Sequence, residues 1–178
     1  MQALNTGYNY AWCVIGNMYL EGKFFEKDET EALRCYIKAY ELGERSEELL
    51  KNIPSYYSSL FAELYNQKNY SEAFIACKNS VDLGETNNLY WLGFMFETGL
   101  GVEKDLYQAA TYYEEALTKG VKTEKSKEYL ARTYYNIFAE KYRENDFKTA
   151  LLFCEKAVGL GSQKAQDYLP MVKRKAAQ

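Results

Sequence analysis

The chain contains no histidine in its 178 residues. This absence removes Ser-His and Cys-His nucleophilic catalysis, histidine metal ligands and the commonest general base. Adjacent acidic pairs such as Glu47-Glu48 and Glu114-Glu115 do not replace it, because neighbouring residues on a helix do not converge on one point. We therefore expect a protein that is not an enzyme, with no catalytic residues, no cofactor and no metal site.

Proline, long apolar runs and paired cysteine motifs are also scarce. The only prolines are Pro54 and Pro170, so long helices are rarely interrupted. No apolar stretch approaches the roughly 20 residues of a membrane span, and no signal-peptide pattern opens the chain. The four cysteines, Cys13, Cys35, Cys77 and Cys154, show no CxxC spacing. We expect a cytoplasmic protein with reduced, buried thiols and no membrane partner.

Basic charge is not in excess either. The formal net charge is −3 and the sequence pI about 5.3, which argues against binding nucleic acid by phosphate neutralisation. The one basic cluster, Lys173 to Lys175, is typical of a solvated chain end. The expected partner is therefore a protein or peptide of unknown identity.

What the sequence does contain is a pattern that recurs four times. An alanine is preceded by Asp or Asn four residues earlier and followed by glycine eleven residues later. The alanines are Ala32, Ala73, Ala109 and Ala150; the preceding residues are Asp28, Asn69, Asp105 and Asp146; the glycines are Gly43, Gly84, Gly120 and Gly161. Four units with the same landmarks predict a repeat protein.

Each position of the pattern has a physical cause. Asp and Asn are N-cap residues, whose side-chain oxygens accept from free amides of the first helical turn. Glu31, Glu72 and Gln108 follow three residues later and complete a capping-box pattern in three units. The alanines let a neighbouring helix approach closely, and we expect Ala32, Ala109 and Ala150 to be buried at helix crossings. The glycine ends the helix in a left-handed cap.

A first helix precedes each of these second helices. In the first and third units Ile15-Gly16 and Leu92-Gly93 correspond at an offset of 77 residues. The first helix of the second unit lies near Tyr56 to Tyr65, and that of the fourth runs from about Ser126 to Arg143, with Leu130-Ala131 in the Leu-Gly role.

The predicted fold is therefore an all-α, right-handed α-solenoid of about four helix-turn-helix repeats plus a C-terminal helix. We predict a single repeat domain over residues 1–178, with repeats at about 8–43, 53–84, 87–120 and 126–161 and a last helix over 162–175.

The segment from Tyr90 to Asp105, followed by Ala109, Tyr112-Tyr113, Ala116 and Gly120, resembles the Sel-one-like repeat, a tetratricopeptide-like family. The first unit matches well but has Phe24-Phe25 where Gly-Val is usual. The second resembles an ordinary tetratricopeptide unit. The resemblance implies a right-handed superhelix, a concave face built mainly from first helices, and a scaffold or adaptor role in protein complexes.

The resemblance also implies where a partner binds, because concave positions of this superfamily flank the Leu-Gly pair. The positions for partner contact are Tyr10, Asn17, Asn87, Tyr90, Phe94, Glu97, Arg132 and Tyr135, with Cys13 and Asn136 beside them and Glu63 and Asn66 as weaker choices. In the second unit Phe61 or Ala62 takes the glycine role. The alternative is that the aromatic residues pack between helices.

We expect the chain to bind a peptide or helix with some basic character in a concave groove centred on the third unit. The alternative is a regulatory or non-catalytic subunit, or a fragment of a larger repeat protein, with possible self-association through the repeat ends. A chaperone-tail clamp is excluded, since Cys13, Asn87 and Trp91 stand where basic residues would be needed.

Overall fold

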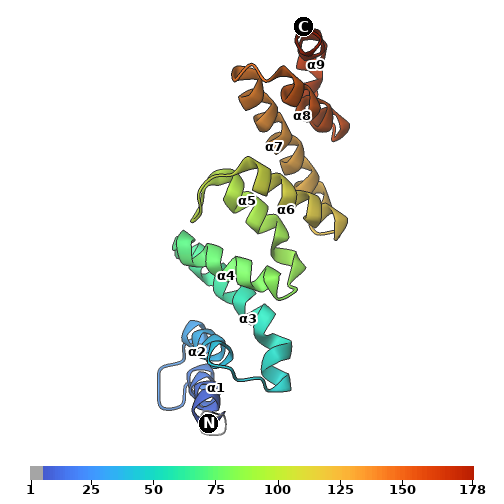
Figure 1. The fold of residues 1–178 in the computed structure, drawn as a ribbon. Helices are drawn as coiled ribbons and strands as arrows, with labels where there is room; N and C mark the ends of the chain where they lie inside the picture. The colour runs from blue at the N-terminus through green and yellow to red at the C-terminus, as the bar shows by residue number, and fades with distance from the viewer. Residues whose placement is uncertain (1–5) are drawn as a thin grey trace. The chain divides into compact units, whose positions relative to one another are not determined.

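The computed structural model describes residues 6–178, and this part of the chain is all-α (Figure 1). Over these residues it contains nine α-helices, one short 3₁₀ turn and no strand. The elements are α1 (Thr6–Glu21), α2 (Glu29–Glu41), α3 (Glu47–Asn66), α4 (Tyr70–Asp82), the 3₁₀ turn η1 (Thr86–Asn88), α5 (Leu89–Thr98), α6 (Leu106–Thr118), α7 (Thr123–Arg143), α8 (Phe147–Gly159) and α9 (Gln163–Ala176). The predicted order of four helix pairs followed by a last helix is confirmed.

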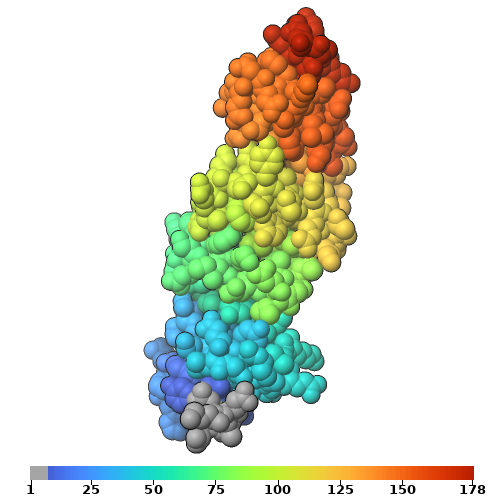
Figure 2. Space-filling view, viewed as in Figure 1, coloured from blue at the N-terminus to red at the C-terminus, as the bar shows by residue number. Residues whose placement is uncertain are grey.

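The chain divides into two compact units, Met1–Asn88 and Leu89–Gln178. In the first, α1 packs on α2 and α3 on α4, with η1 against α4. In the second, α5 packs on α6 and α7 on α8, with α9 against α8. Side chains close the gaps between the paired ribbons of each unit (Figure 2). The single domain over residues 1–178 stays a prediction. None of the helices described is both long and apolar enough to cross a membrane.

The second helices form where the pattern predicts them. Ala32, Ala73, Ala109 and Ala150 are each at most 1% exposed, as expected for residues at helix crossings. Asp28, Asp105 and Asp146 accept a side-chain cap hydrogen bond, whereas Asn69 does not, although its backbone conformation is close to that of Asp146. The N-cap prediction is thus confirmed at three of the four positions.

The capping boxes do not close as the sequence pattern suggests. The N-cap amide of Asp28 donates to the carbonyl of Tyr19 at 3.2 Å, and that of Asp105 to Phe96 at 3.0 Å. Asn69 donates likewise to Leu64. Carbonyls near the end of the first helix already accept hydrogen bonds from these N-cap amides. The acidic or amide side chains at the third helical position are therefore not needed as acceptors for the N-cap amides.

Glycine ends the second helices as predicted. Gly43, Gly84, Gly120 and Gly161 all have φ between 71° and 101°. The next residue then donates back to the carbonyl of a small residue five positions earlier: Glu44 to Ala39, Glu85 to Ser80, Val121 to Ala116 and Ser162 to Ala157, over 2.8–3.0 Å. This is the Schellman arrangement, which satisfies carbonyls left free at a helix end.

The 77-residue offset also relates the second pair of units, which corrects one register. Phe61, Tyr65 and Tyr70 form a chain of edge-on rings, and Phe138, Tyr142 and Phe147 form the same chain 77 residues later. Phe138, and not Ala131, therefore corresponds to Phe61. The predicted alignment of the fourth unit was wrong by seven residues. Because seven residues are about two helical turns, the predicted and the corrected positions lie on the same face of the helix.

The structure also decides which residue of the second unit takes the glycine position and where α3 and α7 begin. Phe61 is 4% exposed while Ala62 lies at the surface, so Phe61 takes the place of the glycine. Helix α3 begins at Glu47, well before the predicted segment, and continues through Pro54. Helix α7 likewise begins at Thr123, three residues before the predicted start.

Candidate functional site

The Leu-Gly pair of the third unit exists because a tyrosine ring occupies the space beside it. A β-carbon added to Gly93 would lie 2.7 Å from ring atoms of Tyr113, which is fully buried in α6. In the first unit a β-carbon on Gly16 would lie 2.8 Å from the ring of Tyr36. Glycine at these two positions allows a first helix to lie directly on a tyrosine of the second helix.

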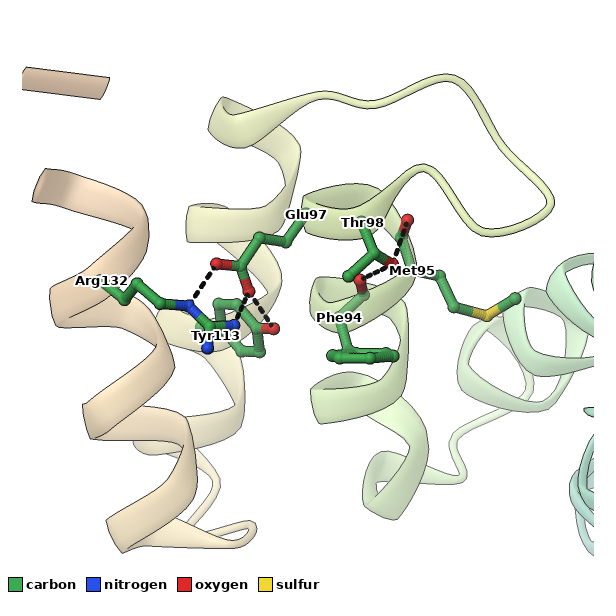
Figure 3. Close-up of polar contacts among 6 residues, drawn as sticks. All are labelled: Phe94, Met95, Glu97, Thr98, Tyr113 and Arg132. Atoms are coloured by element: carbon green, nitrogen blue, oxygen red, sulfur yellow. Dashed lines mark hydrogen bonds and ion pairs between the residues drawn. The ribbon is translucent and has the colours of Figure 1, made fainter. Parts of the chain in front are cut away.

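The Tyr113 hydroxyl points to a charged network that joins α5, α6 and α7 of the second compact unit, Leu89–Gln178. It donates to Glu97 Oε2 at 3.0 Å, and Arg132 of α7 donates to both oxygens of the same carboxylate at 2.8 Å (Figure 3). The Glu97 side chain is only 5% exposed, whereas that of Arg132 is 47% exposed. Burial and then the Glu97 carboxylate raise the pKa of Tyr113, and the hydrogen bonds that Arg132 donates to Glu97 raise the pKa of Arg132.

This network gives Glu97 a role different from the one expected. Both carboxylate oxygens already accept hydrogen bonds from within the chain, and the Arg132 charge balances the acid. A buried carboxylate is stable only when it is paired in this way. Glu97 therefore ties α5, α6 and α7 together.

Tyr90 also lies inside the unit, at 5% exposure. Its ring is edge-on to Tyr129 at 5.5 Å between centroids and tilted against Tyr113 at 5.8 Å. We call Tyr90, Tyr113 and Tyr129 the tyrosine cluster. For Tyr90 the alternative of packing between helices is the one the structure supports. Phe94 is half-buried and lies edge-on to Tyr129 at 6.1 Å.

Two residues around the cluster were missed by sequence reasoning. Tyr129 lies one turn before Arg132 on α7, and the Arg132 guanidinium stands over its ring at 4.1 Å. The Lys122 amine stands over the rings of Tyr90 and Trp91 at 4.7 and 4.5 Å. The signal that could have identified Tyr129 is its spacing of three residues from Arg132 on one helix.

The predicted residues of the fourth unit lie together in an open hollow. Its volume is about 580 Å³, and it lies between α7 and the turn from α8 to α9. We call it the α7–α9 hollow; it is lined by Glu124, Lys127, Glu128, Ala131, Arg132, Tyr135, Asn136, Leu160, Gly161, Ser162 and Lys164. Arg132, Tyr135 and Asn136 thus share one surface, and the residues from the α8–α9 turn were not predicted.

The predicted residues of the first unit share a smaller hollow of about 230 Å³. We call it the α1–α3 hollow; it is lined by Tyr10, Cys13, Asn17, Leu20, Tyr36, Ser46, Glu48, Leu49 and Tyr56. Tyr36 donates a hydrogen bond to Asn17 Oδ1 at 2.6 Å, which holds that side chain against the helix pair. Burial, followed by the charges of Glu44 and Glu48, raises the pKa of the Cys13 thiol.

The remaining predicted positions are polar residues at or near the surface. Asn87 is exposed in η1, and its amide donates to Glu85 at 2.9 Å. Glu63 accepts from Gln67 at 2.7 Å, and Asn66 is exposed at the end of α3. Asn87 belongs to the first compact unit and Tyr90 to the second.

The cysteines are free thiols. Cys35, Cys77 and Cys154 are buried as predicted, but Cys13 is only half-buried because it borders the α1–α3 hollow. Cys77 donates to the carbonyl of Asn88 at 3.7 Å and Cys154 to that of Ala165 at 3.3 Å. Within residues 6–178 no group of three or more Cys, Asp or Glu side chains is placed to hold a metal ion.

Comparison with known proteins agrees with the repeat pattern. The family model described as the Sel1 repeat matches residues 8–44 and 89–121. No match was found among curated proteins.

Two solved structures are similar to the chain. One is a Sel1 repeat protein from Oxalobacter formigenes, with a TM-score of 0.49 and 22% identity over 90% of this chain and 62% of that one. The other is c5321, a protective antigen of uropathogenic Escherichia coli displaying an SLR fold, with a TM-score of 0.35 and 20% identity over 92% of this chain and 48% of that one. The chain thus spans less than two thirds of either. The family model thus matches the two units whose sequences resemble this repeat, over residues 8–44 and 89–121.

Proposed function

We propose that this chain is a protein–protein interaction adaptor, and that it binds a peptide or a short helix in the α7–α9 hollow. Sel1 repeats are in general protein–protein interaction modules, which supports the broad role. The observation that supports the site is the hollow itself. It is the largest of the described hollows, at about 580 Å³, and it brings together Arg132, Tyr135 and Asn136, which lie on the face of α7 where partner contact was expected.

The side chains of the hollow suit a peptide better than a small charged ligand. Tyr135 is half-buried and supplies apolar ring area, and tyrosine is enriched among residues that dominate binding energy. Asn136 can both donate to and accept from a peptide backbone. The lining carries two acidic residues, Glu124 and Glu128, and three basic ones, of which Arg132 is already paired with Glu97. Such mixed charges favour orientation of the partner over strong attraction of one charge sign.

This proposal moves the centre of binding from the third unit to the fourth. On the third unit Tyr90 and Glu97 are buried and already contact other side chains of the chain. The hollow beside Tyr135 is left open by the chain's own side chains. Further contacts at Tyr10 and Asn17 in the α1–α3 hollow, and at Asn87, remain part of the proposal.

The experiment is affinity capture with the full chain, followed by mass spectrometry and by quantitative binding of each captured protein. We expect Asn136→Arg and Tyr135→Ala each to weaken binding by about tenfold or more, as for residues central to an interface. The matched control is Leu152→Ala, at a residue of α8 that is 51% exposed and outside the hollow.

Circular dichroism shows whether each variant keeps its helical content. Asn136→Arg adds a bulky charge at the rim without removing a buried ring, so it separates loss of binding from loss of fold. Retained binding in both folded variants, or loss in the Leu152→Ala control alone, would show that the partner binds elsewhere.

A further inference from the structure

The turn between α1 and α2 holds a phenylalanine in a backbone conformation that favours glycine. Phe24 has φ of 70°, and its side chain is 86% exposed, the highest value among the described large apolar residues. The equivalent residue 77 positions later is Gly101, with φ of 74°. Left-handed backbone is unfavourable for a residue with a β-carbon and is unusual for a bulky one. The first unit therefore accepts backbone strain at a position where its twin has none.

The fold of the turn does not require the Phe24 ring. Both turns begin with a left-handed glycine, Gly22 at φ 68° and Gly99 at φ 75°. Both close with the N-cap amide of the second helix donating to the first helix, as described for Asp28 and Asp105. Since the same turn forms with Gly101 in the third unit, the phenyl group adds nothing to its shape.

The neighbouring residue keeps the turn in place. The Phe25 ring stacks on Tyr19 of α1, with centroids 4.5 Å apart and 17° between the planes. Phe24 is thus presented to solvent from an anchored turn. A strained, exposed and anchored aromatic residue costs stability without helping the fold, which is the pattern found at binding sites.

We propose that Phe24 is the anchor of a second docking surface, and that its partner is a protein with an apolar pocket rimmed by lysine or arginine. The charges around the turn indicate this rim. Residues 21–29 hold four acidic side chains against two basic ones. Both lysines are already paired, Lys23 with Glu21 at 2.7 Å and Lys27 with Glu29 at 2.9 Å.

The excess of acidic side chains in this turn favours a protein pocket over a lipid surface as the partner. An anionic bilayer attracts basic segments and repels acidic ones, so it disfavours this turn. A pocket with basic residues at its edge is complementary to the same charges, and a single aromatic side chain in a pocket can dominate an interface. This surface is independent of the α7–α9 hollow.

The test places p-benzoylphenylalanine at position 24 of the full chain and irradiates it in a lysate of the cells that naturally express the chain. A second chain carries the same photoreactive residue in place of Tyr107, an exposed aromatic residue of α6. We expect position 24, but not position 107, to form adducts with apolar residues of one protein surface that has lysine or arginine at its edge.

Competition with unlabelled chain makes the result quantitative. Wild-type chain is expected to suppress the adduct, Tyr135→Ala chain to suppress it equally well, and Phe24→Gly chain to be about tenfold weaker. The proposal is overturned by no adduct, by the same adducts at both positions, by an adduct with a second copy of the chain, or by equal competition from Phe24→Gly. Flotation with vesicles of phosphatidylcholine and phosphatidylserine that depends on Phe24 would also overturn it.

Discussion

At the scale of single residues, two glycines are determined by tyrosines on the next helix. Tyr36 and Tyr113 lie under Gly16 and Gly93, and their hydroxyls reach Asn17 and Glu97 of the same first helices. The ring therefore needs a neighbour without a side chain, and its hydroxyl needs an acceptor one residue or one turn further on. A close-packed interior makes such positions intolerant of even one added carbon.

Replacing Gly93 by Ala is expected to lower the free energy of unfolding by roughly 1–3 kcal/mol, because the new methyl group overlaps a ring that has no room to move. The control is Gly159→Ala at the end of α8, where an added β-carbon meets nothing within 4 Å. That change should stabilise the chain by roughly 0.5–1 kcal/mol through lower backbone entropy of the unfolded state. Urea denaturation of both variants measures the difference, and equal midpoints would contradict the account.

Phe24→Gly is expected to leave the fold as stable as before, or more stable by up to about 1.5 kcal/mol. Relief of left-handed strain contributes roughly 1–2 kcal/mol and the greater freedom of unfolded glycine opposes it by roughly 0.5–1 kcal/mol. Thermal unfolding measures the effect, with Gly101→Phe in the twin turn as the reciprocal variant that should destabilise. A marked loss of stability in Phe24→Gly would mean that the ring packs after all.

At the scale of helices, the carboxylate of Glu97 joins α5 to α6 and α7. Its position on α5 is set by the repeat, but its partners come from two later helices. Arg132 is half-exposed, so its charge is partly solvated, whereas the Glu97 carboxylate is buried and has Arg132 as its ion-pair partner.

Removing Arg132 alone should therefore destabilise the chain more than removing the charges of both Arg132 and Glu97. We expect Arg132→Met to destabilise the chain by roughly 1–3 kcal/mol, the cost of leaving a buried acceptor without its donor. Adding Glu97→Gln to this variant should recover part of the loss, since the neutral amide oxygen can still accept from Tyr113. Urea denaturation of the single and double variants measures the coupling, and a double variant no more stable than Arg132→Met would contradict it.

At the scale of the whole chain, the 18 tyrosines make alkaline pH the informative condition. Burial, followed by neighbouring groups, raises the pKa of Tyr36 from its ordinary value of 10 to about 12. Burial, followed by Glu41, raises the pKa of Tyr57 to about 12 as well. The folded first compact unit, Met1–Asn88, thus retains the hydroxyl protons of Tyr36 and Tyr57 at a pH where the unfolded chain releases them.

The sign of the pH effect follows from linkage. Below pH 10 both states hold the protons, and the stability is fully present; between pH 10 and 12 the unfolded state gains by ionising, so stability falls as pH rises. Helical circular dichroism and tyrosinate absorbance measured together should show unfolding in this window. Tyr57→Phe should shift the loss to higher pH, because one proton no longer couples to folding. Full tyrosine ionisation with the helices intact would contradict the prediction.

Much of this organisation could be predicted from the sequence. Local signals mark where second helices start and stop, since an N-cap carboxylate and a left-handed glycine act within one turn of chain. The N-cap residue and the terminal glycine recur in all four units, so the helix pairs and the buried alanines were predictable. The alignment of the first helices between repeats was less predictable. In the fourth unit Leu130-Ala131 resembles the Leu-Gly pair, and only the ring contacts of Phe138 show which residues correspond.

The sequence by itself determined the fold class and the ends of the second helices, because the N-cap and glycine signals act within one turn of chain. The tertiary structure alone decided which residues of the first helices are available. Tyr90 and Glu97 have the same periodicity as exposed neighbours, but Tyr129 and Arg132 of another helix cover or pair with them. Tyr135 and Asn136 border an open hollow because the α8–α9 turn stands beside them. Periodicity fixes the direction in which a side chain points, whereas its exposure depends on helices that are distant in sequence.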